Sequence, residues 1–551
     1  MIDNDALAEF LFPETHESIA DLEAESPPRL LKEGAQVTRF APSPTGFLHT
    51  GSLFTAMVSF LTARKSGGVY YVRLEDTDTK RTIQGSEKDL IEQLANFGIV
   101  PDEGFSLEGE KGAYGPYRQS DRRDIYKTVI KELVRMGRAY PDFCSAEDLA
   151  RIRAEQEEKK ILPGYYGIYA RDRDLSNEER VARIKNGEPY VIRYRSNGDH
   201  EKKTKFFDVI RGEIELQDND TDVVILKSDG LPTYHFAHVC DDHFMRTTIV
   251  TRGEEWISST PIHLDLFRAL GWRNPKYAHI PSIMKLDNGN RRKLSKRKDP
   301  EAAVSYFADL GYPKESLIVY LMSIANSNFE EWTIANKSFD IAKFPFSIKK
   351  MSLDGALFDQ MKLNYFSKEV IVRKEVDVEL EEIREYAKAH EERLVELIDR
   401  DEEYVKRILS IGRTGKNPRK DCAKYSEIYD LIGYFYRDIY DSLPNELPFR
   451  EGIDKEKIKE LLIDCANLPV GGDEQSWFEE LKSIGAKHGF ATSNKDYKAD
   501  PTSYVGSVSD CAEILRVAIV GSNQSPNLHD ILEIIGAEEA RYRLGKVISR
   551  L

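Results

Sequence analysis

The sequence predicts an α/β protein in which a parallel sheet carries an α+β insertion and is followed by an all-α region. Residues 37–40 and 69–74 have the β-branched and aromatic side chains typical of strands, and apolar residues at helical spacing lie between them. A strand, a helix and a second strand within about 40 residues form a parallel βαβ unit, as in Rossmann-type domains. After residue 345 the strand signals fade and amphipathic helices dominate, which predicts the helical C-terminal region.

Changes of pattern divide the chain into five parts. The first is polar and contains Pro27-Pro28, which predicts a short helical extension that ends in a linker. The region after Ser120 combines charged helices with strand-like segments and interrupts the sheet, which is expected to resume at 222–226 and at 248–252. The predicted parts are residues 1–35 (extension), 36–119 (first half of the sheet domain), 120–220 (insertion), 221–345 (second half) and 346–551 (helical region).

Composition and charge limit the possible functions. The chain has 551 residues and a net charge of −15, which argues against a protein that coats nucleic acid nonspecifically but is compatible with a local basic face. No stretch approaches the ~18 consecutive apolar residues of a membrane span. The acidic N-terminus is typical of neither a secretory signal nor a transit peptide. Five cysteines without a CxxC pair favour reduced thiols, so a cytoplasmic protein without a membrane partner is expected.

The first chemical signal is the loop at residues 41–52, which opens a helix at the end of a predicted parallel strand. Open α/β sheets bind ligands at this edge, and amide groups at a helix start attract phosphate. Gly51 would let a nucleotide approach the backbone, and His49 could donate to phosphate oxygens as charge develops in a transition state. The alternative is a proline-rich turn with an incidental histidine, because three residues match by chance often.

The second signal is the basic segment at residues 291–298 (RRKLSKRK), in which six of eight side chains are cationic. A basic loop of this kind can close over a triphosphate and neutralise charge as pyrophosphate departs. A solvated loop or a localisation tag is the alternative interpretation.

Together these segments resemble the HxGx and KMSKS-like motifs of the class I aminoacyl-tRNA synthetases, here His49-Thr50-Gly51-Ser52 and residues 293–297 (KLSKR). Further segments resemble the glutamyl subgroup and occur in its order and at about its spacing. The resemblance is strong over residues 36–332 and weaker over the helical remainder. The matching segments are residues 38–46 (TRFAPSPTG), 72–78 (VRLEDTD), 115–122 (GPYRQSDR), 226–243 (LKSDGLPTYHFAHVCDDH) and 252–263 (RGEEWISSTPIH).

The resemblance implies an ATP site and a glutamate pocket. Glutamate has two carboxylates and one ammonium, so its pocket needs two cations and an anion; ordinary strand-end salt bridges are the alternative. By the resemblance, Arg39 and Tyr234 hold the side-chain carboxylate, Arg252 holds the α-carboxylate, and Glu75 with Ser43 takes the ammonium. The full glutamate set is Arg39, Ala41, Ser43, Glu75, Tyr234, His238 and Arg252. The ATP set is His49, Gly51, Ser52, Lys293, Ser295 and Lys296, of which His49, Lys293 and Lys296 are the expected catalytic residues.

Two departures from the family pattern stand out. Relatives commonly carry Asn at the position of His238, whose imidazole could replace one hydrogen bond but would change its charge near neutral pH. Some relatives bind zinc in the insertion through three cysteines and a histidine or tyrosine. Only Cys144 remains there, so we expect no structural zinc and no metal site beyond the Mg²⁺ that accompanies ATP.

The implied reaction joins L-glutamate to tRNA(Glu) through glutamyl-adenylate, with the insertion on the acceptor stem and the helical region on the anticodon. Whether tRNA(Gln) is also charged stays open, and a monomer is expected. A basic turn near Arg419 is a candidate RNA contact. An equally good interpretation is a surface loop whose positive charge offsets the negative charge of the nearby acidic helix. The candidate RNA-binding residues are Arg118, Arg122, Lys416, Arg419, Arg516, Arg541 and Arg543.

Four other functions fit the sequence less well. A glutaminyl-tRNA synthetase would carry a β-barrel anticodon module, and the truncated relative that glutamylates a modified tRNA base lacks an anticodon domain. An inactive tRNA-binding paralogue is disfavoured by intact His49, Ser295 and Lys296. A dinucleotide-binding oxidoreductase is disfavoured because no GxGxxG follows the first strand.

Overall fold

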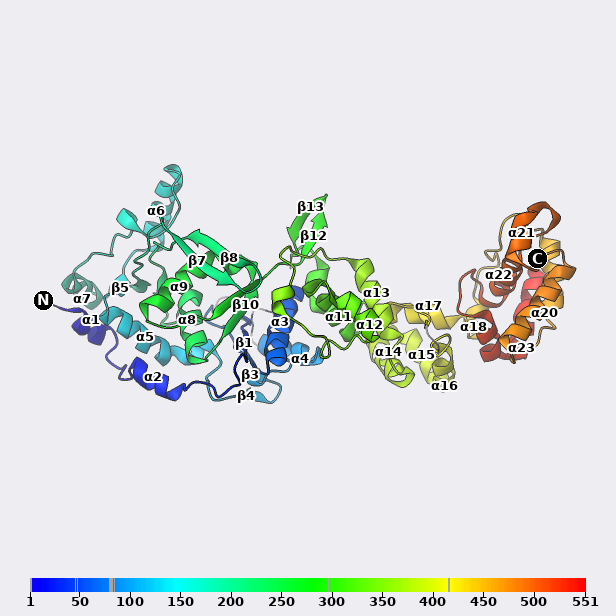
Figure 1. The fold of residues 1–551 in the computed structure, drawn as a ribbon, viewed down its shortest axis with the longest axis horizontal. Helices are drawn as coiled ribbons and strands as arrows, with labels where there is room; N and C mark the ends of the chain where they lie inside the picture. Colours follow the sequence, from blue (N-terminus) through cyan, green and yellow to red (C-terminus); the bar gives the residue numbers. More distant parts are fainter. Residues whose placement is uncertain are drawn as a thin grey trace. The chain divides into compact units, whose positions relative to one another are not determined.

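The computed structural model describes residues 2–44, 46, 48–78, 83, 85–295, 297–414 and 417–551. The chain forms two compact units (Figure 1). Unit 1 comprises Met1–Tyr306 and Ile318–Phe358, and unit 2 comprises Phe307–Leu317 and Asp359–Leu551. The sequence predicts one boundary after residue 345, whereas the compact units meet at Phe358 and also exchange Phe307–Leu317, because helical signals begin before the first unit ends.

A parallel sheet forms the centre of unit 1. Strand β1 (Val37–Phe40) pairs in parallel with β2 (Val69–Val72), and β2 pairs with β3 (Glu103–Ser106). On its other side, the amide of Thr248 donates to the carbonyl of Val37 at 3.0 Å, which places β10 (Ile249–Gly253) beside β1. Strand β1 thus lies between neighbours that come from distant parts of the chain, a topological switch point at which open sheets bind ligands.

Helix α3 (Thr50–Ser66) connects β1 to β2 and packs on β1 and β10 (Figure 1). The helix ends at Gly67, whose φ of 67° lies in the left-handed region that favours glycine. This confirms the strand–helix–strand unit that the sequence predicts.

Two expectations about the sheet need correction. Strand β9 (Val224–Leu226) pairs antiparallel with β6 (Val191–Tyr194) of the insertion, so the parallel sheet resumes only at β10. Conversely, β7 (Lys203–Asp208) pairs in parallel with β11 (Lys276–Ile280), although it lies within the predicted insertion. Local composition reveals that a segment is a strand but does not reveal its partner, because pairing depends on contacts distant in sequence.

The N-terminal extension folds onto unit 1. Helices α1 (Asn4–Leu11) and α2 (Ile19–Glu25) bury Leu7 and Leu22 against α5 (Arg123–Arg135). The remaining elements of unit 1 are β4 (Gly109–Lys111), β5 (Ala139–Asp142), β8 (Gly212–Gln217), β12 (Met284–Asp287), β13 (Asn290–Lys293), α4 (Ser86–Asn96), α6 (Ala146–Glu158), α7 (Asn177–Lys185), α8 (Tyr234–Phe244), α9 (Thr260–Ala269) and α12 (Phe329–Asn336).

Among the described residues of unit 2, helices joined by loops are the named regular elements, as predicted. The acidic segment after residue 375 forms three helices, α14 (Val376–His390), α15 (Glu392–Arg400) and α16 (Glu402–Leu409). Their apolar faces join one buried core with the later helices of the unit. These later helices are preceded by α13 (Gln360–Ile371) and comprise α17 (Ile428–Gly433), α18 (Arg437–Asp441), α19 (Lys455–Cys465), α20 (Glu474–Lys487), α21 (Asn494–Ala499), α22 (Val508–Val520) and α23 (Leu528–Arg550).

Helices α10 (Val304–Asp309) and α11 (Lys314–Ala325) occupy the stretch of chain in which the two units alternate. In the described part of the chain, every helix is too short or too polar to cross a lipid bilayer.

Candidate active site

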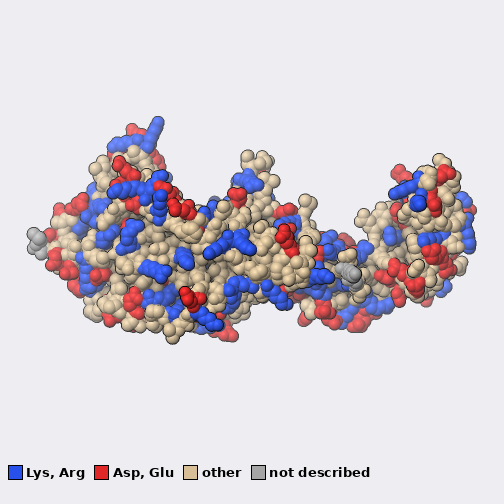
Figure 2. All heavy atoms as spheres, viewed as in Figure 1, with Lys and Arg blue, Asp and Glu red and all other residues tan. Residues whose placement is uncertain are grey.

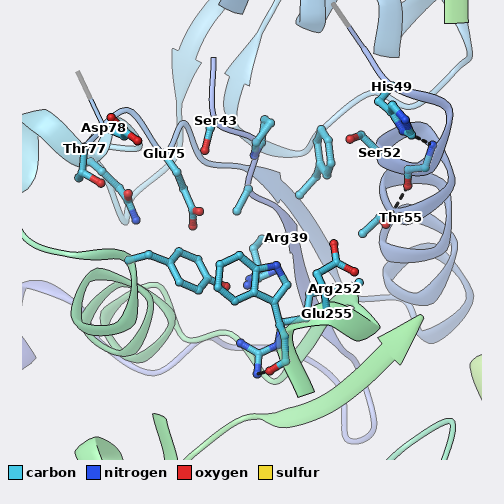
Figure 3. A pocket seen from close by; sticks show the side chains of 18 of the residues that line it. Arg39, Ser43, His49, Ser52, Thr55, Glu75, Thr77, Asp78, Arg252 and Glu255 are labelled. Atoms are coloured by element: carbon cyan, nitrogen blue, oxygen red, sulfur yellow. Dashed lines mark hydrogen bonds between the residues drawn. The ribbon is translucent and has the colours of Figure 1, made fainter. Parts of the chain in front are cut away.

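A cavity of about 1340 Å³ opens at the carboxyl ends of β1 and β10, larger than the roughly 300–1,000 Å³ typical of a small-molecule site. Figure 3 shows Glu75 and Ser43 on one side of this pocket and His49 on the opposite side. The cavity therefore has room for two small molecules side by side. Ten predicted site residues line it: Arg39, Ala41, Ser43, His49, Gly51, Ser52, Glu75, Tyr234, Arg252 and Lys293.

His49 forms the N-cap of α3. Its Nδ1 accepts a hydrogen bond from the Gly51 amide at 2.9 Å, so the neutral imidazole carries its proton on Nε2. A Cβ at position 51 would lie 3.1 Å from His49 Nδ1, which explains why the turn favours glycine there. The HxG spacing thus presents an imidazole N–H donor beside the amide groups that begin the helix.

The start of α3 is also tied to the segment that follows the basic loop. The Thr50 hydroxyl donates to the Glu301 carbonyl at 2.8 Å, and the Val304 amide donates to the Leu48 carbonyl at 3.2 Å. These bonds bring the two predicted nucleotide motifs together although they are about 240 residues apart in the chain.

The basic loop leaves the β12–β13 hairpin and is held by Asp299. The Asp299 carboxylate accepts two hydrogen bonds from Arg292, at 2.5 and 2.8 Å, and one from the Ser295 amide at 2.8 Å. The bonds from Arg292 lower the pKa of Asp299 below its ordinary value. Ser295 is thus fixed through its backbone and does not line the cavity, and Lys296 lies outside the described residues.

Lys293 reaches the cavity from the end of β13. Its Nζ lies 3.1 Å from the Glu255 carboxylate, and both side chains are about half exposed. An exposed pair of this kind contributes roughly 0–1 kcal/mol. Lys293 can therefore exchange Glu255 for a phosphate at little cost.

A buried ionic network supports the opposite side of the cavity. Asp242 lies 3.2 Å from Arg39 Nε and 2.8 Å from Arg73 Nη1, and Arg73 Nη2 donates to Glu75 at 2.9 Å. Burial would raise the pKa of Asp242, but the two guanidiniums outweigh it and hold that pKa well below its ordinary value. Burial prevails at Glu75, whose pKa is raised although the same arginines lower it.

His238 lies behind this network and not in the cavity wall. Its side chain is fully buried, with Nδ1 2.7 Å from Asp242, and its ring stacks on Tyr234 with centroids 5.8 Å apart. Burial lowers its pKa to about 3, despite Asp242, so the imidazole is neutral at physiological pH. The expectations that His238 lines the glutamate pocket and changes charge near neutrality are both wrong, since burial disfavours its cationic form.

Comparisons with known proteins show which family the chain belongs to. Residues 36–365 match the family described as tRNA synthetases class I (E and Q), catalytic domain, and residues 507–548 match the anticodon binding domain. The chain is 44% identical over 548 residues to the glutamate–tRNA ligase of Clostridium beijerinckii, covering 98% of this chain and 99% of the relative. The chain belongs to the glutamate–tRNA ligase family. A second family member, the glutamate–tRNA ligase of Acetivibrio thermocellus, is 45% identical over 549 residues. That alignment covers 99% of this chain and 100% of the relative.

A solved family structure supports the same assignment. The glutamate tRNA ligase from Elizabethkingia meningosepticum, crystallised with its amino acid, superposes with a TM-score of 0.73 at 28% identity. The match covers 94% of this chain and 99% of the other. The family assignment thus holds for both the sheet-containing and the helical parts of the chain.

Sequence reasoning missed several residues of the site. Trp256 stacks near Tyr234 with ring centroids 4.2 Å apart and lines the cavity. Arg73 and Asp242 were not assigned to the pocket, although Arg73 stands two residues before Glu75 in a segment that the sequence predicts to continue strand β2 and so to share its face. The alternation Arg-x-Glu was the only local signal, because the partner Asp242 is distant in sequence.

The candidate RNA-binding residues have very different surroundings. Arg122 is buried and its Nε lies 2.7 Å from Asp241, and Arg543 is buried with bonds to the Ile519 and Phe435 carbonyls. The expectation that these two face RNA is therefore wrong, because their guanidiniums are occupied within the fold. Arg541 is exposed.

The other candidates are partly accessible or undescribed. Arg118 is about a quarter exposed and lies 3.4 Å from both Asp76 and Glu87, whereas Arg419 pairs with Asp421. Arg516 is partly buried, and Lys416 lies outside the described residues. On the visible face of the insertion around α6, basic side chains are interspersed with acidic ones (Figure 2).

Around Cys144, where the sequence predicts no structural zinc, two carboxylates lie near the thiol. One ligand atom each of Asp142, Cys144 and Asp172 lies within 4.8 Å of the others. Asp142 already accepts from the Tyr165 hydroxyl and from Arg193 Nε, both at 2.6 Å. This donor set of two carboxylates and one thiol does not match the thiolate-rich sites that zinc prefers.

Proposed function

We propose that the chain activates L-glutamate with ATP and transfers it through glutamyl-adenylate to the 3′-terminal adenosine of tRNA(Glu). One observation carries the proposal: a single cavity holds Arg39, Glu75 and Arg252 on its amino-acid side and His49 and Lys293 on its nucleotide side. The first set has the charges that complement a dicarboxylic amino acid, and the second provides donors for a triphosphate.

On the amino-acid side, Arg39 with Tyr234 would bind the side-chain carboxylate and Arg252 the α-carboxylate. Glu75, with the Ser43 hydroxyl, would accept the ammonium. Asp242 fixes Arg39 through Nε, and the Thr251 carbonyl holds Nη1 at 3.1 Å, so the guanidinium is oriented before the substrate arrives. Preorganised donors of this kind lose little freedom on binding.

On the nucleotide side, His49 would donate from Nε2 to phosphate oxygens at the start of α3. Lys293, released from Glu255, and Lys296 would neutralise charge as pyrophosphate leaves. Gly51 and Ser52 line the same edge of the cavity, and the Ser295 backbone holds the loop in place. Mg²⁺ would enter with the triphosphate oxygens, which are its preferred hard ligands.

The reaction follows from these positions. An oxygen of the glutamate α-carboxylate attacks the α-phosphorus of ATP, and the bond to the bridging oxygen breaks to release pyrophosphate. The 2′-hydroxyl of the terminal adenosine then attacks the activated carbonyl, AMP leaves, and the hydroxyl proton is lost. No side chain forms a covalent bond to substrate, so the protein contributes orientation and charge neutralisation.

Side-by-side charging reactions test this function. Purified tRNA(Glu) and tRNA(Gln) are each incubated with the enzyme, ATP and either glutamate or glutamine. We expect glutamate to be attached to tRNA(Glu) and glutamine to neither RNA; attachment of glutamine would overturn the proposal. Glutamate on tRNA(Gln) would establish a second RNA substrate, and absent ATP–pyrophosphate exchange with tRNA present would identify an inactive RNA-binding protein.

The expected setting is a cytoplasmic monomer that binds its RNA. The five cysteines are unpaired, which is compatible with a reducing compartment. Light scattering of the purified protein, with and without tRNA, tests the monomer.

A further inference from the structure

Arg252 is surrounded differently from the other buried arginines near the cavity. Arg39 and Arg73 pair with Asp242, and Arg122 pairs with Asp241. Among the described residues, no carboxylate oxygen lies within the 4.0 Å ion-pair distance of the Arg252 guanidinium. Its side chain is only 4% exposed, so a buried cation here is held without a counter-charge, an arrangement that is costly unless hydrogen bonds or a ligand compensate it.

Neutral groups hold this guanidinium in place. Nε donates to His279 Nε2 at 3.0 Å, Nη1 lies 3.1 Å from His263 Nδ1, and Nη2 donates to the Thr260 hydroxyl at 2.8 Å. A further bond from Nη2 reaches the Trp256 carbonyl at 3.3 Å. These bonds use four of the five N–H groups of the guanidinium, and the Tyr234 hydroxyl, another neutral group, also interacts with it.

The two imidazoles can have only one arrangement of protons. An arginine donates from every nitrogen, so His279 Nε2 and His263 Nδ1 must both be acceptors. His279 then carries its proton on Nδ1, which lies 2.7 Å from Asp208. His263 carries its proton on Nε2, which lies 3.1 Å from His235 Nδ1. A continuous chain of hydrogen bonds thus runs from the Asp208 carboxylate through Arg252 to His235.

In this chain of hydrogen bonds, the Asp208 carboxylate and the Arg252 guanidinium are charged, and burial keeps the imidazoles between and beyond them neutral. His263 and His279 are fully buried, and burial lowers the pKa of both. The nearby His238 ring, with its centroid 4.5 Å from that of His263, and Arg252 itself lower the pKa of His263 further. Protonation of either imidazole would turn an acceptor into a donor facing a guanidinium, which disfavours that form.

We propose that His263 and His279 are positioning residues that hold Arg252 as a cation without a counter-charge, reserved for the α-carboxylate of the amino acid. This inference rests on the proposed role of Arg252 in glutamate binding and adds how its charge is kept available. A carboxylate at either histidine position would orient the guanidinium equally well but would also neutralise it. A neutral acceptor orients the guanidinium without neutralising its charge.

Two variants of nearly equal shape test the proposal. His263→Asn keeps a neutral acceptor near the position of Nδ1, whereas His263→Asp places a carboxylate there. In aminoacylation of tRNA(Glu), we expect His263→Asn to change the KM for glutamate by about threefold or less and His263→Asp to raise it at least tenfold. The KM for ATP should change in neither variant. Equal KM values for glutamate in the two variants would overturn the proposal.

A binding measurement separates a positioning role from a merely structural one. The α-amide of glutamate lacks the charge that Arg252 would bind, so wild-type protein should bind it at least tenfold more weakly than glutamate by calorimetry. His263→Asp should reduce this preference, and His263→Asn and His279→Gln should retain it. If one of these three variants does not fold, as judged by circular dichroism, the other two decide the outcome: a changed preference in His263→Asn or His279→Gln, or an unchanged one in His263→Asp, overturns the proposal.

The same binding measurement on Arg252→Ala shows whether a negative result concerns only the positioning role of the histidines or also the proposed glutamate site. Loss of the preference in Arg252→Ala, with no difference between His263→Asn and His263→Asp, would leave the glutamate site standing and overturn the positioning role. An unchanged preference in Arg252→Ala would remove Arg252 from the α-carboxylate site and overturn both.

Discussion

The two sides of the cavity hold their charges in opposite ways. On the amino-acid side, Arg39, Glu75 and Asp242 are buried and share partners, so each charge depends on its neighbours. On the nucleotide side, Lys293 and Glu255 form a single half-exposed pair. Buried networks are costly to disrupt, whereas exposed pairs are exchanged easily. If the two sides bind as proposed, the amino acid meets a fixed arrangement of charges and the triphosphate an adjustable one.

The largest effect is expected from Arg39→Ala. This change removes one carboxylate ligand and leaves Asp242 with fewer donors, so kcat/KM for glutamate should fall about a thousandfold, or roughly 4 kcal/mol. Aminoacylation at varied glutamate concentration measures this effect. Arg268→Ala, at an arginine that is 64% exposed on α9, is the control and should behave like wild type. Unchanged glutamate kinetics in Arg39→Ala would remove this residue from the pocket.

Glu75→Gln should have the next largest effect, about a hundredfold on kcat/KM for glutamate, because the ammonium loses its anionic partner. It should also alter the pH profile. The pKa of Glu75 is raised by burial, so the carboxylate is lost as pH falls through that raised value, and kcat/KM should decline at a higher pH than an ordinary glutamate would cause. In Glu75→Gln this acid limb should vanish; a persistent limb would assign the titration to another group.

Gly51→Ala tests the nucleotide side through His49. The new Cβ would lie 3.1 Å from Nδ1, so the imidazole must shift by a few tenths of an ångström. We expect about a tenfold lower rate of ATP–pyrophosphate exchange in the presence of tRNA, with glutamate KM nearly unchanged. Gly545→Ala introduces the same methyl group where nothing lies within 4 Å and should leave exchange unaltered. A larger change in glutamate KM than in exchange rate would contradict the division of the cavity.

A smaller effect is expected from Glu255→Gln, which frees Lys293. Because an exposed pair contributes up to about 1 kcal/mol, the KM for ATP should fall by no more than about fivefold. Salt titration provides an internal check, since screening should reduce the difference between variant and wild type. A tenfold or greater loss of activity would instead place Glu255 in direct contact with substrate.

The smallest effect is expected from His238→Asn. The neutral imidazole contacts Asp242 and Tyr277 behind the pocket, and an amide can supply similar bonds. Glutamate kinetics should change by about threefold or less, and the pH profile between 6 and 8 should keep its shape. A changed profile in that range would restore His238 as a titrating group of the pocket.

Short-range pattern predicted the parallel βαβ unit with α3, and the family resemblance supplied the ten predicted residues that line the cavity, most of which lie at or near the ends of strands or the starts of helices. It did not predict the partner of β9 or the burial of Arg122 and Arg543, which depend on contacts with distant segments. The same limit explains why Arg73, His263 and His279 were missed. Each acts through a residue that is far away in sequence or belongs to another strand, and one chain alone carries no record of such pairs.

The bond between the Thr50 hydroxyl and the Glu301 carbonyl couples the two nucleotide motifs mechanically. Asp299, which anchors Arg292 and Ser295, stands two residues before Glu301. In the proposed site, a phosphate that drew the basic loop inward would also pull on the first turn of α3, and with it on the orientation of the His49 ring. Movement of the loop and alignment of the imidazole would then be one motion.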